Sequence, residues 1–418
     1  MPLKIYRNAQ IFTPVDSGKP CSGPNQGRIA HYDRGALLVR DGVIENIGEE
    51  RHVCKGLEKE QLIDEYDCGG RCLIPGFVDP HTHCCFAALR ESEFEQRVAG
   101  TPYLEILKRG GGILSSVKAV AQASVDDLYS MTRKHALRAM ALGTTTLEIK
   151  SGYGLTTENE LKMLEAIGRV ARDVPLDVVA TFLGAHAIPV EFKDRADDYI
   201  TLVIDEMLPA VKAQGIANVC DIFCEQGVFN IEQGRLLLQA ALDLGMNVKI
   251  HADEVHDLGG AKLAADLQAI SADHLLAAND ENIAAMAEAG VVANLLPATA
   301  YSLRKSYARA RAMIELNVPV ALATDCNPGS SFTESMQFVF GLAVLNMEMS
   351  PAEALIGTTL NSAYSIGMAD KVGSLDCGKQ ADFLLLDGET PAILAYHAGV
   401  SSVQEIYKKG VKINNQCC

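Results

Sequence analysis

The pattern of hydrophobic and polar positions divides the chain into three parts. Residues 3–70 alternate as strands and turns, and Asp41-Gly42 stands between two apolar runs as a strong hairpin signal. The segments 381–388 and 405–413 have the same strand–turn character. In the long middle part, helical stretches end in Gly or Asn and a β-branched strand follows each of them. We therefore expect one small sheet domain built from both ends of the chain around a different middle domain.

The middle part predicts a parallel sheet covered by helices, because helices alternate there with apolar, β-branched strands. Eight strand candidates over this length favour a closed (β/α)8 TIM barrel over an open doubly wound sheet. Thr157 and Glu160 predict a capping box at the start of one helix. The candidate strands end near His81, Lys150, His186, Glu225, His251, His274, Leu296 and Asp325.

The predicted fold is therefore α/β, with a barrel and a small β-sandwich-like domain. Residues 1–74 form the N-terminal part of the small domain, residues 75–370 form the barrel, and residues 371–418 form the C-terminal part of the small domain. The stretch Ile74–His83 is predicted as a buried strand at the border between the two domains.

Composition narrows the class of function without changing the fold. The chain is 48% hydrophobic and 22% charged, with a formal net charge of -16 and no dense run of Lys or Arg. These values predict a sizeable core and argue against nucleic acid or an anionic membrane as partner. The first residues lack the apolar core of a signal peptide and no uncharged stretch is long enough to span a membrane, so we expect a cytoplasmic protein.

The twelve cysteines contain no Cys-x-x-Cys spacing. Cys68 with Cys72, and Cys220 with Cys224, are interpreted as core residues of strands rather than metal ligands. Cys84 and Cys85 are interpreted as small core hydrophobes rather than catalytic thiols, because no base accompanies them in the pattern.

Five histidines fall at predicted strand ends on one rim, which is where barrels of this class carry their sites. Residues two apart on a strand point the same way, so His81 and His83 project together. Two such histidines alone are often ordinary polar loop residues, but five on one rim favour a metal site. The predicted ligands are His81, His83, His251 and Asp325, a set that suits Zn or Fe with a water. Glu254 and His274 are candidates for proton transfer.

Several motifs resemble the amidohydrolase superfamily. They are Pro-Gly-Phe-Val-Asp-Pro-His-Thr-His at 75–83, the strand-five and strand-six histidines, and the strand-eight aspartate. Within that superfamily, Lys150-Ser-Gly-Tyr-Gly and Ala323-Thr-Asp-Cys-Asn-Pro-Gly-Ser are similar to segments of the imidazolonepropionase family, and the resemblance covers nearly the whole chain. It implies hydrolysis of the cyclic amide of 4-imidazolone-5-propanoate to N-formimidoyl-L-glutamate, a step of L-histidine degradation, and it favours a homodimer.

The resemblance also implies roles for single residues. Arg90 offers a guanidinium fork to the propanoate, although a surface ion pair is its other interpretation. In the implied reaction a metal-activated water attacks the ring carbonyl, and His274 stabilises the oxyanion. Which of His274, Asp325 and Glu254 is the general base stays open. Substrate contacts are implied for Arg90, Tyr153, His186, Glu254 and Ser330, and product contacts for Asn327 and Gly329.

Three alternatives accompany this interpretation. A deaminase acting on a nucleobase-like ring would share the His251-x-x-Glu254 spacing and the same ligands, while Arg90 favours a substrate with a carboxylate. A metal-free barrel kept as a binding module would lack some ligands, and none is missing. A second metal would need a bridging group on strand four, where Glu225 stands and no lysine does, so one metal is expected. The stretch Arg97–Leu114, with its Gly110–Gly112 run, is interpreted either as a lid or as a plain helix end.

Overall fold

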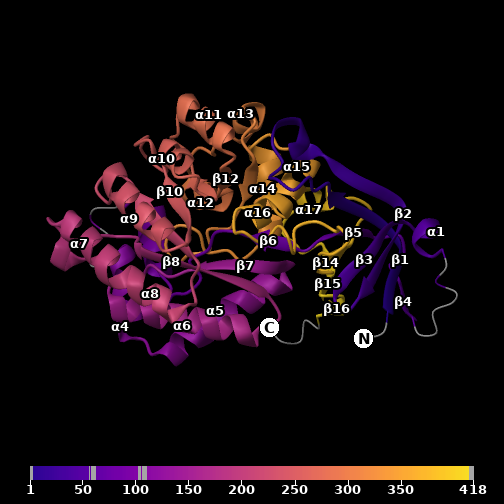
Figure 1. The fold of residues 1–418 in the computed structure, drawn as a ribbon, viewed down its shortest axis with the longest axis horizontal. Helices are drawn as coiled ribbons and strands as arrows, with labels where there is room; N and C mark the ends of the chain where they lie inside the picture. Colours follow the sequence, from indigo (N-terminus) through magenta and orange to yellow (C-terminus); the bar gives the residue numbers. More distant parts are fainter. Residues whose placement is uncertain (1–2, 56, 58–62, 102–104, 106–110, 414–418) are drawn as a thin grey trace.

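The computed structural model describes residues 3–55, 57, 63–101, 105 and 111–413. Its larger part is a sheet of eight parallel strands in sequence order, with helices packed around it (Figure 1). This is the barrel that the sequence predicts, and every candidate strand is present. The strands are β6 (Phe77–Asp79), β7 (Thr144–Lys150), β8 (Asp177–Ala185), β9 (Val219–Cys224), β10 (Asn247–Ala252), β11 (Ser271–His274), β12 (Val292–Leu295) and β13 (Val320–Leu322).

The barrel closes just beyond the ends of its first and last strands. Thr82 and Cys326 form a parallel bridge, and the backbone N–H of Asp325 donates to the carbonyl of His81 at 3.1 Å. Below this bridge, the carboxylate of Asp79 accepts hydrogen bonds from the backbone N–H and the hydroxyl of Thr324, at 3.1 and 2.6 Å. This closure of the barrel, the seam, therefore places His81 and His83 beside Asp325.

Helices cover the outside of the barrel and add short segments at its rim. Apolar side chains of the strands, such as Leu147 and Ile149, pack beneath them in one large core. The helices are α2 (Glu91–Val98), α4 (Ile113–Gln122), α5 (Val125–Ala141), α6 (Thr157–Asp173), α7 (Ala196–Leu202), α8 (Leu208–Gln214), α9 (Ile231–Asp243), α10 (Gly260–Asp266), α11 (Asp280–Ala289), α12 (Pro297–Leu303), α13 (Ala310–Glu315), α14 (Met336–Asn346), α15 (Pro351–Gly357), α16 (Leu360–Tyr364) and α17 (Ile393–Tyr396).

The capping prediction at the start of α6 is wrong by one residue. The N-cap is Thr156, whose hydroxyl accepts from the backbone N–H of Asn159 at 3.3 Å. Glu160 takes no part in this cap. Its carboxylate instead accepts from the backbone N–H groups of Gly154 and Leu155 at 2.7 and 2.8 Å. A buried carboxylate that holds the loop after β7 is not available to the helix terminus, which explains the difference.

The second sheet joins strands from both ends of the chain, as expected. Its order is β16–β15–β14–β5–β1–β2–β3, with β4 also paired to β1. Asp41 and Gly42 have φ angles of 52° and 83°, so the hairpin between β2 and β3 has the left-handed turn that its sequence indicates. The strands are β1 (Leu3–Pro14), β2 (Ile29–Arg40), β3 (Val43–Glu49), β4 (Ile63–Asp67), β5 (Cys72–Pro75), β14 (Phe383–Leu386), β15 (Val403–Lys408) and β16 (Val411–Lys412), with the short helix α1 (Glu50–Val53) after β3.

The second sheet curls around a core of its own. A bridge from Val43 to Gln380 brings the β2–β3 hairpin against the segment before β14. Inside, the rings of Tyr6, Phe383 and Tyr407 contact one another, with centroids 4.4–5.0 Å apart. This arrangement agrees with the sandwich-like small domain, whose boundaries at 74/75 and 370/371 stay a prediction.

The stretch Ile74–His83 is two short strands rather than the single strand expected. The break falls at Gly76, where a Cβ atom would stand 2.3 Å from Oγ1 of Thr145. Before it, β5 belongs to the second sheet, and after it, β6 belongs to the barrel. The glycine thus lets the chain pass closely over β7 as it changes sheets.

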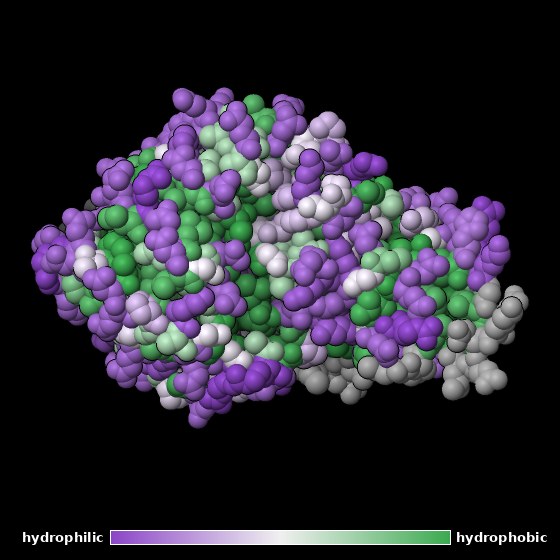
Figure 2. Space-filling view, viewed as in Figure 1, coloured by the Kyte–Doolittle hydropathy of each residue, from purple (hydrophilic) through white to green (hydrophobic). Residues whose placement is uncertain are grey.

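The surface and the remaining segments agree with the composition. Figure 2 shows hydrophilic residues along most of the outline of the molecule. Among the described residues, no helix has both the length and the apolar character needed to cross a membrane. The proposed lid or helix end at 97–114 includes residues 102–104 and 106–110, which lie outside the described residues, and it stays a prediction. The cysteines expected in the core are buried and free, including Cys84 and Cys85, and burial raises the pKa of the Cys85 thiol to about 12.

Candidate metal centre and active site

Four side chains from three places in the barrel meet at one point. Nε2 of His83 lies 3.2 Å from Nε2 of His81 and 3.2 Å from Nε2 of His251. Oδ1 of Asp325 lies 3.6 Å from Nε2 of both His81 and His83. The first pair follows β6, His251 lies on β10, and Asp325 follows β13 across the seam. The structure thus brings together all four predicted metal ligands.

The spacing of these donor atoms fits a bound transition metal. Two ligand atoms, each about 2.1 Å from one zinc ion, stand roughly 3.0–3.4 Å apart. The Nε2–Nε2 distances fall in that interval. Nδ1 of His83 and both ring nitrogens of the neighbouring His274 have no hydrogen-bond partner among the described residues, although all are buried. The three Nε2 atoms and Oδ1 of Asp325, which converge on one point, are a donor set that a divalent ion would satisfy.

Two carboxylates lie against Nδ1 of two of the imidazoles. Nδ1 of His81 donates to Oδ2 of Asp273 at 2.5 Å, whereas Oδ2 of Asp221 lies 3.0 Å from Nδ1 of His251 in a close contact that lacks the angle of a hydrogen bond. A carboxylate at Nδ1 leaves the lone pair on Nε2, which points to the meeting point. Burial, and next the charge of Lys150, lower the pKa of His81 well below its usual value, so the ring is neutral. A neutral ring is the form that binds a metal.

Asp325 completes the set from the last strand. Its Oδ2 accepts a hydrogen bond from the hydroxyl of Thr299, on α12, at 2.5 Å. Burial raises the pKa of the Asp325 carboxyl to about 6, and His274 opposes that rise. Asp325 and His274 both have positive φ, at 53° and 78°, which is strained for residues other than glycine. Such strain at two converging side chains is typical of a functional site.

His274 and Glu254 form a second pair beside the ligands. Nδ1 of His274 lies 3.8 Å from Oε1 of Glu254, and the His274 ring centroid is 5.3 Å from that of His251. The side chain of His274 is 3% exposed and that of Glu254 is 21% exposed. His274 therefore lies inside the site, and Glu254 extends from the site toward the rim of the barrel.

The residues predicted on strands two and three also line the site. The ring of His186 stacks on that of His83 at 4.8 Å, and its Nδ1 donates to the carbonyl of Gly152 at 3.0 Å. Burial lowers the pKa of His186 to about 3, with His251 contributing. Tyr153 is buried, and its ring lies 5.3 Å from that of His186. The loop that carries Tyr153 is the one held by Glu160.

Arg90 and the loop after Asp325 face each other at the outer side of the site. Nη2 of Arg90 pairs with Glu93 at 2.7 Å, but with side chains 14% and 16% exposed this is not the surface ion pair that was its alternative interpretation. Its guanidinium also packs against Gly329, where a Cβ atom would stand 2.5 Å from Nη1. Asn327 shapes the loop, since its Oδ1 accepts from the backbone N–H of Gly329 and of Ser330 at 2.8 and 2.7 Å.

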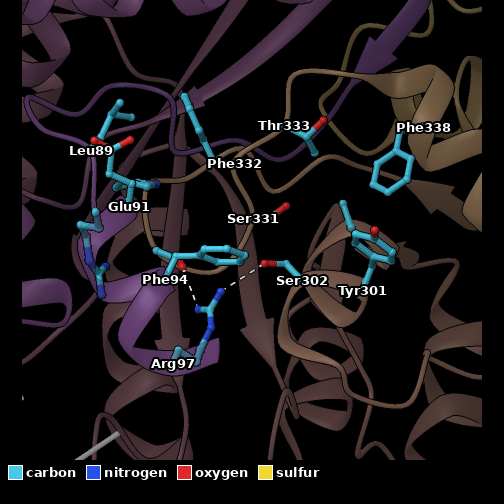
Figure 3. A pocket seen from close by; sticks show the side chains of 14 residues that line it. Leu89, Glu91, Phe94, Arg97, Tyr301, Ser302, Ser331, Phe332, Thr333 and Phe338 are labelled. Atoms are coloured by element: carbon cyan, nitrogen blue, oxygen red, sulfur yellow. Dashed lines mark hydrogen bonds between the residues drawn. The ribbon is translucent and has the colours of Figure 1, made fainter. Parts of the chain in front are cut away.

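A pocket of about 310 Å³ opens beside Arg90 and Gly329. Figure 3 shows Arg97 and Phe94 at this pocket. Arg97 donates to the hydroxyl of Ser302 at 3.3 Å and to the carbonyl of Gly329 at 3.0 Å. The pocket thus joins α2, α12 and the loop after β13. The outer side of the site is therefore lined by apolar side chains such as Phe94 and by the cationic side chains of Arg90 and Arg97.

Glu225, at the end of β9, is turned away from the meeting point. Its carboxylate accepts from the backbone N–H of Val255 at 2.9 Å and from Nδ1 of His256 at 2.7 Å. Glu225 therefore anchors the loop that carries Glu254 instead of joining the converging donors.

Comparison with known proteins places this site in a family. A model of the Amidohydrolase family matches residues 72–413. A relative from Desulfotalea psychrophila, named imidazolonepropionase, is 66% identical over 99% of this chain and all of that protein. The chain belongs to the imidazolonepropionases of the amidohydrolase family. A second relative of that name, from Syntrophobacter fumaroxidans, is 60% identical over 98% of this chain and 96% of that protein.

Solved structures show the same fold at much lower identity. Guanine deaminase from E. coli has a TM-score of 0.70 at 16% identity, covering 99% of both chains. The 5-methylcytosine deaminase from Klebsiella pneumoniae has a TM-score of 0.72 at 16% identity, covering 98% of both chains. At such low identity, the structural similarity shows that the barrel and the second sheet are shared, and it says nothing about the substrate.

The sequence interpretation missed the charged residues beneath the histidines. The sequence assigned no role to Asp221 or Asp273, and the candidate strand that ends near Lys150 was expected to place this residue at the rim, whereas its side chain is fully buried. A signal was present, because Lys249 precedes His251 by two positions and must face the same way. Charged residues within otherwise apolar strand segments therefore indicated a charged layer below the ligands.

Proposed function

We propose that this chain hydrolyses the cyclic amide of 4-imidazolone-5-propanoate to N-formimidoyl-L-glutamate, a step of L-histidine degradation. The observation that carries the proposal is the 66% identity, over nearly the whole chain, to a relative named imidazolonepropionase. Family membership makes the chain a hydrolase. The convergence of His81, His83, His251 and Asp325 supplies the chemistry that such a reaction requires. A cytoplasmic location and a homodimer stay predictions.

We propose one zinc or iron ion per chain, held by those four residues. An ion bound there lowers the pKa of a water molecule and polarises a carbonyl group. Glu225 supports a single ion, because its carboxylate is occupied by Val255 and His256 on the neighbouring loop. The described part of the strand-four end has no lysine to bridge a second ion.

The substrate would be oriented by its carboxylate. Arg90 lies at the outer side of the site, against Gly329 and beside the pocket. A propanoate would take hydrogen bonds from the guanidinium in place of, or together with, Glu93. The hydroxyl of Tyr153 would serve the same end of the substrate, and that of Ser330 would do so by giving up its hydrogen bond to Oδ1 of Asn327 at 3.3 Å. His186 would serve the ring. This orientation directs the ring amide toward the ligands.

Proton transfer would fall to the groups beside the ligands. His274 has ring nitrogens without a partner among the described residues, so it is free to donate to the carbonyl oxygen as negative charge develops there. Asp325 or His274 accepts the proton of the attacking water. Glu254, once it has received that proton, delivers it to the ring nitrogen as the bond of that nitrogen to the carbonyl carbon breaks. The water oxygen ends in the new carboxylate, and that nitrogen ends in the formimidoyl group.

The test is an assay with metal-analysed enzyme. Loss of the ultraviolet absorbance of 4-imidazolone-5-propanoate is followed together with appearance of N-formimidoyl-L-glutamate by mass spectrometry. Turnover of a nucleobase with release of ammonia, and none of the imidazolone, would overturn the proposal in favour of a deaminase. Two equivalents of tightly bound metal would overturn the single-ion part alone.

A further inference from the structure

Beneath the ligand histidines, the barrel interior contains charged residues where such barrels usually have apolar ones. Glu148, Lys150, Asp221, Lys249 and Asp273 all have side chains that are 0% exposed. We call these five residues the ionic layer. Burying charges is costly even when they are paired, and apolar residues of the same volume are often as stable or more stable. The ionic layer therefore calls for an explanation other than stability.

Lys150 connects the layer to His251. Its Nζ lies 2.8 Å from Oδ2 of Asp221 and 2.7 Å from Oε1 of Glu148. The same Oδ2 of Asp221 lies 3.0 Å from Nδ1 of His251. One oxygen atom thus lies between a lysine ammonium and the ring nitrogen of a ligand, and moving the ammonium changes where that oxygen stands.

Lys249 makes the corresponding connection to His81. Its Nζ lies 3.3 Å from Oδ2 of Asp273, which accepts from Nδ1 of His81 at 2.5 Å. It also donates to the carbonyl of Pro80, the residue before His81, at 2.6 Å. Lys249 therefore fixes both the carboxylate that orients the ring and the backbone next to it. Glu148, 3.8 Å from Lys249, links the two halves of the layer.

The arrangement acts on the direction of the imidazole lone pairs. A carboxylate fixed at Nδ1 sets the tautomer and the ring orientation, so that Nε2 points to the meeting point. We propose that Lys150 and Lys249 are positioning residues that hold Asp221 and Asp273 against His251 and His81 and thereby set the affinity of the site for a divalent ion. The inference rests on the proposed metal ligands and extends them to two lysines that touch neither ion nor substrate.

The chain offers a matched control in Lys408. This lysine is also buried and also lies between two carboxylates, 2.7 Å from Asp177 and 2.6 Å from Asp382. It further donates to the carbonyl of Thr145, near the start of β7. Neither carboxylate contacts a ligand histidine. Loss of Lys408 therefore reproduces the cost of unpairing one buried carboxylate, Asp382, and one partly buried carboxylate, Asp177, without disturbing the ligands.

The experiment compares zinc binding by the full-length apo proteins of wild type, Lys150→Met, Lys249→Met and Lys408→Met. Zn²⁺ is titrated against a chromophoric chelator, after circular dichroism and thermal unfolding have established that each apo protein is folded. We expect the Kd for Zn²⁺ to rise about 10- to 100-fold in the first two variants. Lys408→Met should lose thermal stability and keep the wild-type Kd. A purely structural role of the layer would lower thermal stability in all three variants and leave all three Kd values alike, which would overturn the inference.

Two further results are decisive. If Lys150→Met does not fold, the double variant Lys150→Met/Glu148→Gln replaces it, because this variant removes one charge of each sign. A raised Kd for Zn²⁺ in the double variant supports the positioning role of Lys150, and a wild-type Kd overturns it. If wild type itself binds neither Zn²⁺ nor Fe²⁺, the proposed metal centre fails and the inference fails with it. Tight binding by wild type with an unchanged Kd in the lysine variants overturns only the positioning role.

Discussion

Nε2 of His83 and Nε2 of His251 lie 3.2 Å apart, although 168 residues separate them in the chain. The barrel creates this proximity, because β6 and β10 both end at the same rim. Both Nε2 atoms face the same point as Oδ1 of Asp325, which lies 3.6 Å from Nε2 of His83. Their proximity is best accounted for by a common cation between their lone pairs.

Replacing His251 with alanine should therefore remove the metal. We expect metal content far below one equivalent by mass spectrometry of the metals, and a loss of activity beyond the roughly 100-fold that loss of an outer-sphere partner costs. The exposed His397 provides the control, since His397→Ala should keep both metal and activity. Full metal content in His251→Ala would remove His251 from the ligand set.

Replacing His274 with alanine should separate catalysis from metal binding. His274 lies beside the ligands and 3.8 Å from Glu254, and it is not in the proposed ligand set. A residue that transfers a proton or stabilises an oxyanion contributes about 10²- to 10⁴-fold to the rate. We expect kcat to fall by that factor with one equivalent of metal retained. Near wild-type turnover in the metal-loaded variant would exclude a catalytic role.

Replacing Arg90 with glutamine should weaken the grip on the substrate carboxylate. A hydrogen bond to a charged group contributes about 1.5–3 kcal/mol, which corresponds to roughly 10- to 150-fold in kcat/KM. The propanamide analogue of the substrate should be hydrolysed equally well by wild type and Arg90→Gln. Glu93→Gln, which frees Arg90 from its internal partner, should not raise KM. An equal loss for acid and amide substrates would count against carboxylate recognition.

Replacing Glu225 with glutamine should change both turnover and acid stability. Burial raises the pKa of Glu225, but hydrogen bonds from Val255, Gln226 and His256 outweigh it and lower the pKa below its usual range. A carboxyl with a lowered pKa contributes stability that is fully present above its unfolded pKa, about 4.3, and is lost as the pH falls through the folded pKa. The thermal unfolding curves of wild type and Glu225→Gln should thus differ near neutral pH and converge in acid.

The same variant tests the role of Glu225 in placing Glu254. Because Val255 follows Glu254 directly, a looser loop should lower kcat, by up to about 100-fold, without loss of metal. Unfolding curves that stay parallel from acid to neutral pH would show that the Glu225 carboxylate is not held as described.

Much of the barrel could be predicted from the sequence because its signals are local. Runs of β-branched residues after a helix-ending Gly or Asn marked several of the strands, and the i, i+2 spacing of His81 and His83 set their common direction. The break at Gly76 could not be found this way, because it depends on the close passage of Thr145, a residue far along the chain. The cap of α6 was misplaced for a similar reason, since tertiary contacts with the loop after β7 engage Glu160.

The site was predictable in its ligands and less so in their support. Histidines at strand ends stand out against an apolar background, and a family resemblance assigned them. Asp221 and Asp273 indicate a charged layer within their strands, but a single acidic residue in a strand does not disclose which ring nitrogen it meets. Arg90 had two interpretations in the sequence, and its pairing with Glu93 depends on the turn of α2, which only the structure shows.

The position of β5 between β1 and β14 has a consequence for biosynthesis. β5 pairs with β14 through Leu73–Leu385, so a strand that leaves the ribosome early waits for one made near the end of translation. Until then it presents an open edge of Cys72, Leu73 and Ile74, all of them buried in the finished protein. The second sheet can therefore be completed only after the whole barrel has been synthesised, and the nascent chain depends during that interval on protection from aggregation.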